Sequence, residues 1–477
     1  MIAVSLSEIA LITGGQVFEA LDAGDSTGAD PLVDGPVVTD SREAAPGSLY
    51  IARIGEDLDG HDFVAAACSR GAVAALTSRP VSDLPSVVVQ DVQAAFVSLA
   101  RALAGRNSEV VVIGITGSSG KTSTKDLLSS VLQRHGETVA NVGSLNSEVG
   151  VPLTVCRITA TTAYLVLEMG SRGIGHIDYL TGIAPPKIGV VLNVGTAHVG
   201  EFGSRGAIAR AKAELVQALP ETGFAVLNAD DPMVWDMAGQ TRAHVIGVGE
   251  SPRASVRAAD ITLDTQGRAS FALVTDQGTA PVVLRFHGEH HVGNALAVAA
   301  VALAVGMPLG EVVDALGDAR PLSRWRMEVH ERADGVTIVN DAYNANPDSM
   351  RAALKALAAM GHGRRTWAVL GEMLELGPDS AGEHEAVGRF ATRLGISRVV
   401  AVGPGARPIH QGARDEASGG SGSGESVSVV ADTEAAYQLL RQDVRPGDVV
   451  LVKSSHDAGL RLLGDQLVED TGLQVPS

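Results

Sequence analysis

The residues whose types and spacing are best suited to chemistry form a glycine-rich stretch at 116–124, Thr-Gly-Ser-Ser-Gly-Lys-Thr-Ser-Thr. It follows an apolar run at 109–116 and opens a helical segment, so backbone N–H groups and a helix N-terminus would converge on an anion. In such a loop Lys121 reaches the β- and γ-phosphates and Thr122 binds Mg²⁺. The spacing Gly-x-x-Gly-Lys-Thr is shorter than usual, because Ile115 stands where the usual loop has its first glycine. We predict that the chain binds a nucleotide through Gly117, Ser118, Ser119, Gly120, Lys121, Thr122 and Ser123.

Two more polar residues follow apolar, strand-like runs downstream of this loop. Glu168 ends the run 163–168, and His198 follows the run 187–193. Ligands of open α/β sheets bind outside the carboxyl ends of the strands, so both side chains are candidate metal ligands near the phosphates. Taken alone, a glutamate or histidine at such a position more often has a structural role than binds a metal ion. Lys212 lies on a helical stretch at 208–218 and, taken alone, would be a solvated helix lysine.

The turn at 288–294 introduces an alanine-rich helix at 292–307. His287, His290 and His291 stand near it, but no cysteine or carboxylate completes a zinc-site spacing. We therefore expect this turn, with Asn294, to contact the edge of the nucleotide rather than a metal ion.

The last third of the chain carries a second group of polar residues. Arg324 and Arg326 could bind phosphate oxygens with their guanidinium groups, although arginines here are equally compatible with plain surface charge. A cluster that is denser in hydrogen-bonding groups than a turn requires follows the strand-like run 336–340: Asp341, Tyr343, Asn344 and Asn346.

The elements that must position these residues alternate between strand-like and helical segments, which predicts an α/β fold. Residues 1–107 form a small N-terminal α/β domain. Residues 108–319 form a central P-loop domain with a doubly wound parallel sheet, because its strand-like runs are apolar throughout. Residues 320–477 form a C-terminal Rossmann-like α/β domain with strand-like runs at 336–340, 366–370, 398–402 and 448–453. The Gly/Ser tract at 418–425 is expected to be a surface loop.

Composition narrows the class of protein. The chain has 477 residues, enough for about three domains. Its 37 Lys and Arg against 55 Asp and Glu give a net charge of −18, which argues against binding of nucleic acid. Two cysteines without a paired spacing fit a reducing compartment, and the apolar run 292–307 is too short to span a bilayer. With no visible secretory signal, we expect a cytoplasmic protein without stable membrane insertion.

Several stretches together resemble the Mur ligases, the ATP-dependent amide-forming enzymes of peptidoglycan precursor synthesis, and most closely their MurF type. The resemblance covers nearly the whole chain. It is carried by residues 39–42, 59–63, 116–126, 145–154, 197–198, 211–214, 341–347 and 370–377. The Leu145 stretch and the last two point to the MurF type over its siblings.

The resemblance implies roles for individual residues. Lys121 would hold the phosphates of ATP, and Thr122 and Glu168 would bind one Mg²⁺. A second Mg²⁺ would lie near His198 and Lys212, with Lys212 carbamylated by CO₂. The catalytic residues would be Lys121, His198, Lys212 and Arg326. Contacts to ATP would come from Asn294, Arg326, Asp341, Tyr343 and Asn344. The UDP substrate would be bound by Ser41, Arg42 and Asn146. The chain departs from the family pattern at His291, Ser147 and His456.

The activity implied is the ATP-dependent joining of D-alanyl-D-alanine to UDP-N-acetylmuramoyl-tripeptide through an acyl phosphate, by a monomer. The N-terminal domain would bind the UDP-sugar substrate, the central domain ATP, and the C-terminal domain the amino acceptor. One alternative is a sibling amide ligase with another acceptor, such as the diaminopimelate-adding or folylpolyglutamate type. Another is a P-loop module whose nucleotide state switches a partner. The Asp341 stretch argues against the sibling, and the joint presence of Glu168, His198 and Lys212 against the switch.

Overall fold

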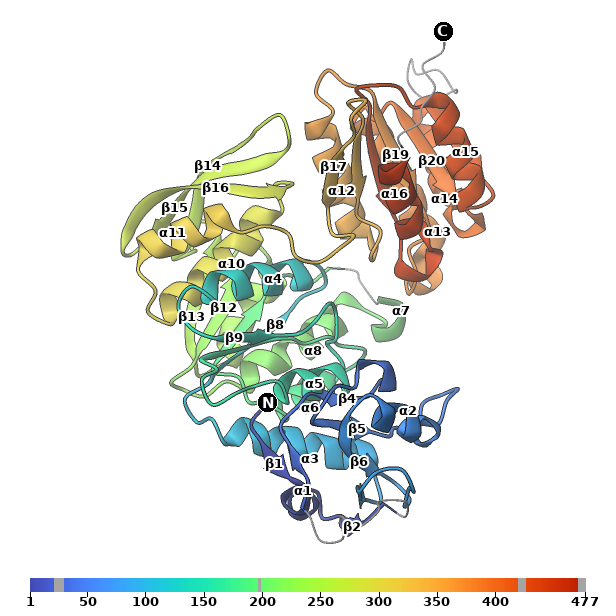
Figure 1. Ribbon diagram of the computed structural model, residues 1–477. Helices are drawn as coiled ribbons and strands as arrows, with labels where there is room; N and C mark the ends of the chain where they lie inside the picture. Colours follow the sequence, from blue (N-terminus) through green and yellow to red (C-terminus); the bar gives the residue numbers. More distant parts are fainter. Residues whose placement is uncertain (21–29, 196–198, 419–425, 471–477) are drawn as a thin grey trace.

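Three α/β units follow one another along the chain, and Figure 1 shows them from blue at the N-terminus to red at the C-terminus. The computed structural model describes residues 1–20, 30–195, 199–418 and 426–470. Their strands form a five-stranded, a nine-stranded and a six-stranded sheet and a two-stranded ribbon. This arrangement confirms the predicted α/β class with three units. His198 and residues 419–425 of the Gly/Ser tract lie outside the described residues.

The N-terminal unit is built on a sheet in the order β2-β7-β6-β5-β4, in which only β2 runs antiparallel to its neighbour. The strands are β2 (Gln16–Phe18), β4 (Val37–Val38), β5 (Ser48–Ile51), β6 (Ala72–Thr77) and β7 (Ser86–Val88), beside the ribbon of β1 (Val4–Ser5) and β3 (Leu32–Val33). The helices are α1 (Leu6–Thr13), α2 (Val64–Ser69) and α3 (Val92–Gly105).

The N-terminal and central units share one apolar core. Phe96 and Leu103 of α3 belong to the same buried cluster as Leu165 and Leu215 of the central unit. Because this cluster is continuous, separating the two units would expose a large apolar area to water.

The central unit is built on a nine-stranded sheet in the order β16-β15-β14-β13-β12-β11-β8-β10-β9. Its strands are β8 (Val111–Thr116), β9 (Thr138–Ala140), β10 (Tyr164–Glu168), β11 (Ile188–Val191), β12 (Phe224–Asn228), β13 (His244–Gly249), β14 (Val256–Leu263), β15 (Arg268–Thr275) and β16 (Gly278–His287). Its helices are α4 (Lys121–Leu132), α5 (Gly150–Val155), α6 (His176–Thr181), α7 (Val199–Phe202), α8 (Arg205–Gln217), α9 (Pro232–Trp235), α10 (His291–Ala304) and α11 (Leu309–Asp318).

The strands next to the glycine-rich loop are covered on both faces. Ile113 and Ile115 of β8 pack in a cluster with α4 and α10, while Leu165 and Leu167 of β10 pack on the other face in a cluster with α8. Burial on two sides explains why these strands read as continuous apolar runs.

One part of the central sheet differs from the prediction of a parallel sheet. The neighbours from β9 to β14 are parallel, but β15 is antiparallel to both β14 and β16. In β15 and β16, inward and outward residues alternate over much of each strand. Strands with this alternation can expose one face to water. Antiparallel sheets commonly do so, whereas parallel sheets are usually covered on both faces.

The C-terminal unit has a six-stranded sheet in the order β17-β18-β22-β19-β20-β21, parallel except for β17. The strands are β17 (Glu328–Glu331), β18 (Thr337–Asn340), β19 (Thr366–Leu370), β20 (Arg398–Val402), β21 (Val427–Val430) and β22 (Val449–Lys453). The helices are α12 (Pro347–Met360), α13 (Ser380–Arg393), α14 (Arg407–Ser418), α15 (Thr433–Asp443) and α16 (Leu460–Glu469).

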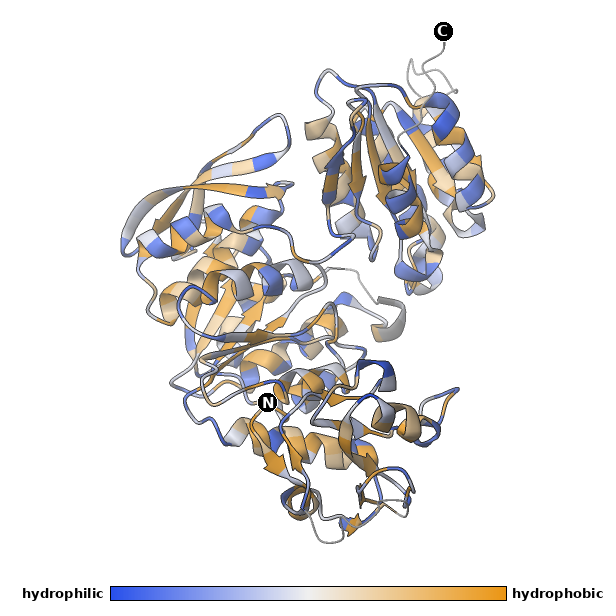
Figure 2. Ribbon diagram, viewed as in Figure 1, coloured by the Kyte–Doolittle hydropathy of each residue, from blue (hydrophilic) through white to orange (hydrophobic). Residues whose placement is uncertain are grey.

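The C-terminal unit has apolar clusters of its own. One joins the sheet to α12, α13 and α14, and the other joins it to α15 and α16. Among the described residues, neither cluster contains a residue before Met327. Figure 2 shows the apolar strands inside each unit.

The alanine-rich segment at residues 292–307 was predicted to form a buried helix, and the structure confirms this. It is α10, whose 14 residues include eleven that are buried. No helix in the described part of the chain is both long and apolar enough to cross a membrane.

A buried carboxylate in the C-terminal unit provides a test of its packing. Asp448 is 4 % exposed, and its carboxylate accepts hydrogen bonds from the indole of Trp367 at 2.8 Å and from Arg365 Nη2 at 2.7 Å. Asp448→Ala leaves both donors without this partner, so we expect a loss on the order of 3 kcal/mol of stability. Calorimetry should show a lower melting temperature, whereas the exposed Asp415→Ala on α14 should leave it unchanged. Equal melting temperatures for the two variants would contradict this account.

Candidate active site

The glycine-rich loop connects the end of β8 to the start of α4 and is held in shape by a neighbouring strand end. Asn193, just after β11, accepts a hydrogen bond from Ser119 N–H at 2.9 Å and donates one to Ser119 O at 3.1 Å. Gly120 has φ +80°, and a Cβ there would lie 2.8 Å from Asn294 Oδ1, so the position requires glycine. Lys121 folds back over the loop and donates to Gly117 O at 2.8 Å. The loop is therefore preformed around a space for an anion.

A carboxylate and a hydroxyl meet beside this loop. Thr122 Oγ1 donates to Glu168 Oε2 at 2.9 Å, and Asn146 Nδ2 donates to Glu168 Oε1 at 2.7 Å. Glu168 ends β10, the strand next to β8, so the sheet itself brings it to the loop. Mg²⁺ in nucleotide sites prefers oxygen ligands, with one or two carboxylates and the phosphates themselves. The described residues contain no group of three His, Cys, Asp or Glu side chains arranged for a metal ion.

Three cationic side chains converge on the same cleft. Burial lowers the pKa of Lys121, and the nearby Arg326 lowers it further while Glu168 opposes the shift. Lys212, on α8, is 6 % exposed, and burial together with the charge of Lys121 holds its pKa well below the usual value. Such a grouping of like charges is unfavourable unless an anion binds among them.

Arg326 reaches this cleft from the C-terminal unit. Its Nη2 donates to Thr122 Oγ1 at 3.2 Å and to Ser144 Oγ at 3.4 Å, and its guanidinium lies 4.2 Å from the centre of the Tyr343 ring. Its Nε is buried and has no hydrogen-bond partner among the described residues. An unpaired buried donor of a guanidinium is costly, and a phosphate oxygen is a suitable acceptor for it.

The loop after β18 is held over the phosphate loop by a buried lysine. Lys453, at the end of β22, donates to Asp341 Oδ2 at 2.6 Å and to Asn344 O at 3.1 Å. Asn346 Nδ2 donates across the domain boundary to Ser118 O at 3.4 Å. These bonds bring Asp341, Tyr343 and Asn344 to the cleft.

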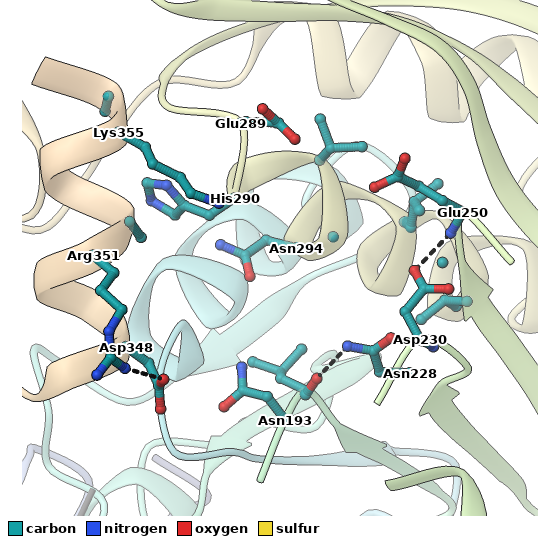
Figure 3. A pocket seen from close by; sticks show the side chains of 18 of the residues that line it. Asn193, Asn228, Asp230, Glu250, Glu289, His290, Asn294, Asp348, Arg351 and Lys355 are labelled. Carbon is teal, nitrogen blue, oxygen red and sulfur yellow. Dashed lines mark hydrogen bonds and ion pairs between the residues drawn. The ribbon is translucent and has the colours of Figure 1, made fainter. Parts of the chain in front are cut away.

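A second hollow, which we call the side cavity, adjoins the cleft. It has a volume of about 370 Å³ and shares Asn193 and Asn294 with the cleft, whose volume is about 350 Å³. Figure 3 shows Arg351 and Lys355 extending toward it from α12, opposite side chains at the ends of β11, β12 and β13. The side cavity therefore leads away from the phosphate loop along the carboxyl edge of the central sheet.

The structure brings most of the predicted site residues together. The cleft is lined by Gly117, Ser118, Ser119, Gly120, Lys121, Thr122, Ser123, Asn146, Glu168, Lys212, Asn294, Arg326, Asp341, Tyr343 and Asn344. Ser41 and Arg42 do not line it. They lie after β4 in the N-terminal unit, where Arg42 Nη2 is 2.6 Å from Asp40 Oδ2. His198 lies outside the described residues.

Three residues that organise the cleft were not predicted from the sequence: Asn193, Ser144 and Lys453. Asn193 and Lys453 stand at the ends of apolar strands, the same signal that identified Glu168. Ser144 lies in a loop whose sequence carries no comparable signal.

Comparison with protein families gives three matches in chain order. Residues 36–106 match the Mur ligase family catalytic domain, residues 115–302 the Mur ligase middle domain, and residues 325–456 the Mur ligase glutamate ligase domain.

Comparison with individual proteins agrees with these matches. The chain is 48 % identical to a UDP-N-acetylmuramoyl-tripeptide–D-alanyl-D-alanine ligase of Mycobacterium tuberculosis, with 98 % of each chain covered. It is similar to a solved structure of MurF from Acinetobacter baumannii, with a TM-score of 0.86, 31 % identity, and coverage of 98 % of this chain and 99 % of that one. It is also similar to MurF ligase from Thermotoga maritima in complex with ADP, with a TM-score of 0.78, 28 % identity, and coverage of 91 % and 97 %. The chain belongs to the Mur ligase family.

Proposed function

We propose that the chain is an ATP-dependent ligase that joins D-alanyl-D-alanine to UDP-N-acetylmuramoyl-tripeptide in peptidoglycan precursor synthesis. The observation that carries the proposal is Arg326, which reaches from the C-terminal unit to the phosphate loop with a buried, unpartnered Nε. The name of the Mycobacterium tuberculosis relative supports the choice of substrates.

The chemistry requires two anions to meet. The γ-phosphoryl group of ATP passes to the terminal carboxylate of the tripeptide, and ADP leaves. The neutral amine of the dipeptide then attacks the acyl phosphate, expels inorganic phosphate and loses a proton as the amide forms. Lys121 and Arg326 face the same cavity from two domains, so together they can neutralise the charge that would keep carboxylate and triphosphate apart. Closure of the two domains also excludes water, which would hydrolyse the acyl phosphate.

We place the phosphates of ATP on residues 117–123 and its nucleoside toward Asn294 and Asp341. Asn294 lies between the cleft and the side cavity, which offers room of about 370 Å³ for a purine nucleoside. Tyr343 and Asn344 line the cleft itself and would contact the nucleotide there. The ADP named with the Thermotoga maritima structure supports the use of an adenine nucleotide.

The donor set beside the loop fits Mg²⁺, with Thr122 and Glu168 as the groups that would hold it. When bound, the ion would supply positive charge that offsets the negative charge of the phosphates. Asn146 fixes the orientation of Glu168 through its 2.7 Å hydrogen bond, so the carboxylate is aligned before a ligand arrives.

Lys212 is proposed to act as a carbamate, with His198 as its partner at a second metal site. Only a neutral amine reacts with CO₂, and burial together with the charge of Lys121 holds the pKa of Lys212 well below its usual value, which favours the neutral amine. Carbamylation would convert a buried amine into an anion in a cleft crowded with cations. This change would relieve the repulsion between Lys212 and Lys121.

We propose boundaries near residues 107 and 319 for three domains that bind the UDP-sugar substrate, ATP and the amino acceptor. Ser41 and Arg42 would contact the UDP portion, since they follow the carboxyl end of β4, where ligands of open sheets bind. We further propose that the protein is a monomer and that it acts in the cytoplasm, and the requirement for ATP supports this location.

The proposed reaction is tested by phosphate release from ATP with Mg²⁺ and UDP-N-acetylmuramoyl-tripeptide. The amines offered are D-alanyl-D-alanine, diaminopimelate, lysine and glutamate. We expect release only with the dipeptide, together with a UDP-linked pentapeptide product detected by mass spectrometry. Release with another amine would point to a sibling ligase, and release without any amine to a nucleotide switch.

Replacing Lys212 tests the carbamate. We expect Lys212→Ala to lower kcat about a hundredfold or more, with partial rescue by short carboxylic acids that replace the missing anion. The exposed Lys187→Ala in the same unit is the control and should keep full activity. An unaffected Lys212→Ala enzyme would rule out the carbamate.

The same group predicts a pH dependence. Because the pKa of Lys212 is lowered, the neutral amine persists to lower pH than in an ordinary lysine, and protonation on further acidification prevents carbamate formation. Activity of the wild type should therefore fall on acidification, and added bicarbonate should shift this loss to lower pH. A pH profile that ignores bicarbonate would contradict the assignment.

A further inference from the structure

Arg326 lies on a connection that belongs to neither a helix nor a strand. This connection runs from the end of α11 at Asp318 to the start of β17 at Glu328. An arginine side chain has many rotamers, so holding it in one position costs conformational entropy. Nevertheless its guanidinium lies within hydrogen-bond distance of Thr122 and Ser144 across the domain boundary. Contacts within the C-terminal unit must therefore hold the connection in one conformation.

The backbone on both sides of Arg326 is in the left-handed conformation. Trp325 has φ +58° and Met327 has φ +50°. A residue other than glycine adopts such angles at a cost in free energy, and keeps them only where the surrounding structure enforces them. Two such residues on either side of one arginine indicate a segment whose shape is imposed by its contacts.

Hydrogen bonds to the backbone supply part of this constraint. Met327 N–H donates to Asp341 Oδ1 at 3.0 Å, and Trp325 N–H donates to Glu328 Oε2 at 2.8 Å. Trp325 O accepts from Tyr343 N–H at 3.2 Å. These bonds attach the connection to the loop after β18, whose Asp341 and Tyr343 line the cleft.

The side chain of Trp325 is attached to a different element, α16. Its indole N–H donates to both carboxylate oxygens of Asp465, at 3.0 Å and 3.1 Å. Asp465 also accepts from Nδ2 of Asn340, which is buried at the end of β18. A Cβ at Gly464 would collide with the Asn340 side chain, so α16 packs against the sheet as closely as glycine allows. Asp465 is therefore an acceptor with little freedom to move.

Aromatic rings connect the position of the indole to the guanidinium. The rings of Trp325 and Tyr343 stack, with centroids 6.5 Å apart and an angle of 22° between their planes. The Arg326 guanidinium lies 4.2 Å from the centre of the Tyr343 ring, where the ring attracts a cation. A displaced indole would therefore displace Tyr343 and the guanidinium that lies over it.

We propose that Trp325 and Asp465 are positioning residues that direct Arg326 toward the phosphates of the bound nucleotide. The hydrogen bond between the indole and the carboxylate ties the strained connection to α16, and the Tyr343 ring holds the guanidinium in the matching position. The proposal rests on the ligase function given above. It assigns a task in that reaction to two residues that do not line the cleft.

The first test is a double-mutant cycle of Trp325→Phe and Arg326→Ala. Without the UDP-linked tripeptide no phosphoryl acceptor is present, so calorimetry can measure the Kd of ATP with Mg²⁺. Phenylalanine keeps a ring beside Tyr343 but lacks the indole N–H, and we expect it to raise this Kd about fivefold. In the Arg326→Ala background the same substitution should change the Kd less than about twofold, because the two residues act through one contact. Equal factors in both backgrounds would overturn the proposal.

Trp367→Phe is the matched control. Trp367 Nε1 donates to Asp448 at 2.8 Å, so the chain contains a second indole–carboxylate pair that does not line the cleft. We expect Trp367→Phe to lower the melting temperature and to leave the Kd of ATP and kcat unchanged, whereas Trp325→Phe should lower kcat about tenfold. If both variants lose kcat equally, the role of Trp325 is structural only and the proposal fails.

Asp465 is tested by comparing Asp465→Ala with Asp465→Asn. Asparagine can still accept from the indole N–H, so we expect it to recover at least about threefold of the kcat that the alanine variant loses. The ion pair of Asp465 with Arg324 involves an exposed guanidinium and loses its charge partner in both variants, so it does not account for the difference. An equal loss of kcat in the two variants would contradict the role of Asp465.

The outcomes separate this inference from the function on which it rests. A wild type that binds ATP but releases no phosphate with the dipeptide overturns the ligase function, while the cycle in ATP affinity still decides whether Trp325 acts through Arg326. A wild type that ligates, while Trp325→Phe keeps both its Kd for ATP and its kcat, overturns the inference alone.

Discussion

Repulsion among cations is the constraint on which the rest of this structure depends. Lys121, Lys212 and Arg326 come from three different elements and two domains, and each faces the same small cavity. The pKa of both lysines is lowered because burial and neighbouring positive charge disfavour their charged forms. Holding such groups together without an anion costs free energy, and the surrounding fold must supply it.

Hydrogen bonds from neighbouring polar side chains hold the site in place and offset this cost. The phosphate loop is braced by Asn193, Glu168 is fixed by Asn146, and the Asp341 loop is held by Lys453. Each of these supports is a polar side chain near the end of a strand or in a loop beside the sheet. The apolar strands behind them are buried on both faces, so the supports start from backbone positions that have little freedom to shift.

Much of this could be predicted from the sequence, because local patterns identify both strands and their carboxyl ends. The phosphate loop, Glu168 and the Asp341 cluster follow apolar runs, and the strands at 224–228, 366–370 and 398–402 lie where the periodicity predicts them. The antiparallel strands β14 to β16 were not predicted, since their alternation is interrupted by shifts of register between the paired strands. Ser144 could not be assigned, because its contacts with Thr122 and Arg326 join residues far apart in sequence. Only the folded chain brings such residues together.

The separate apolar clusters of the C-terminal unit have a consequence for how the molecule opens and closes. The N-terminal and central units share one core and must move as a single body, whereas polar contacts such as Arg326 with Thr122 and Asn346 with Ser118 link the C-terminal unit to them. Polar contacts of this kind exchange readily for contacts with water, so the seam can part at little cost in hydrophobic free energy. A ligand that contacts both bodies would add contacts across this seam and hold the two bodies together.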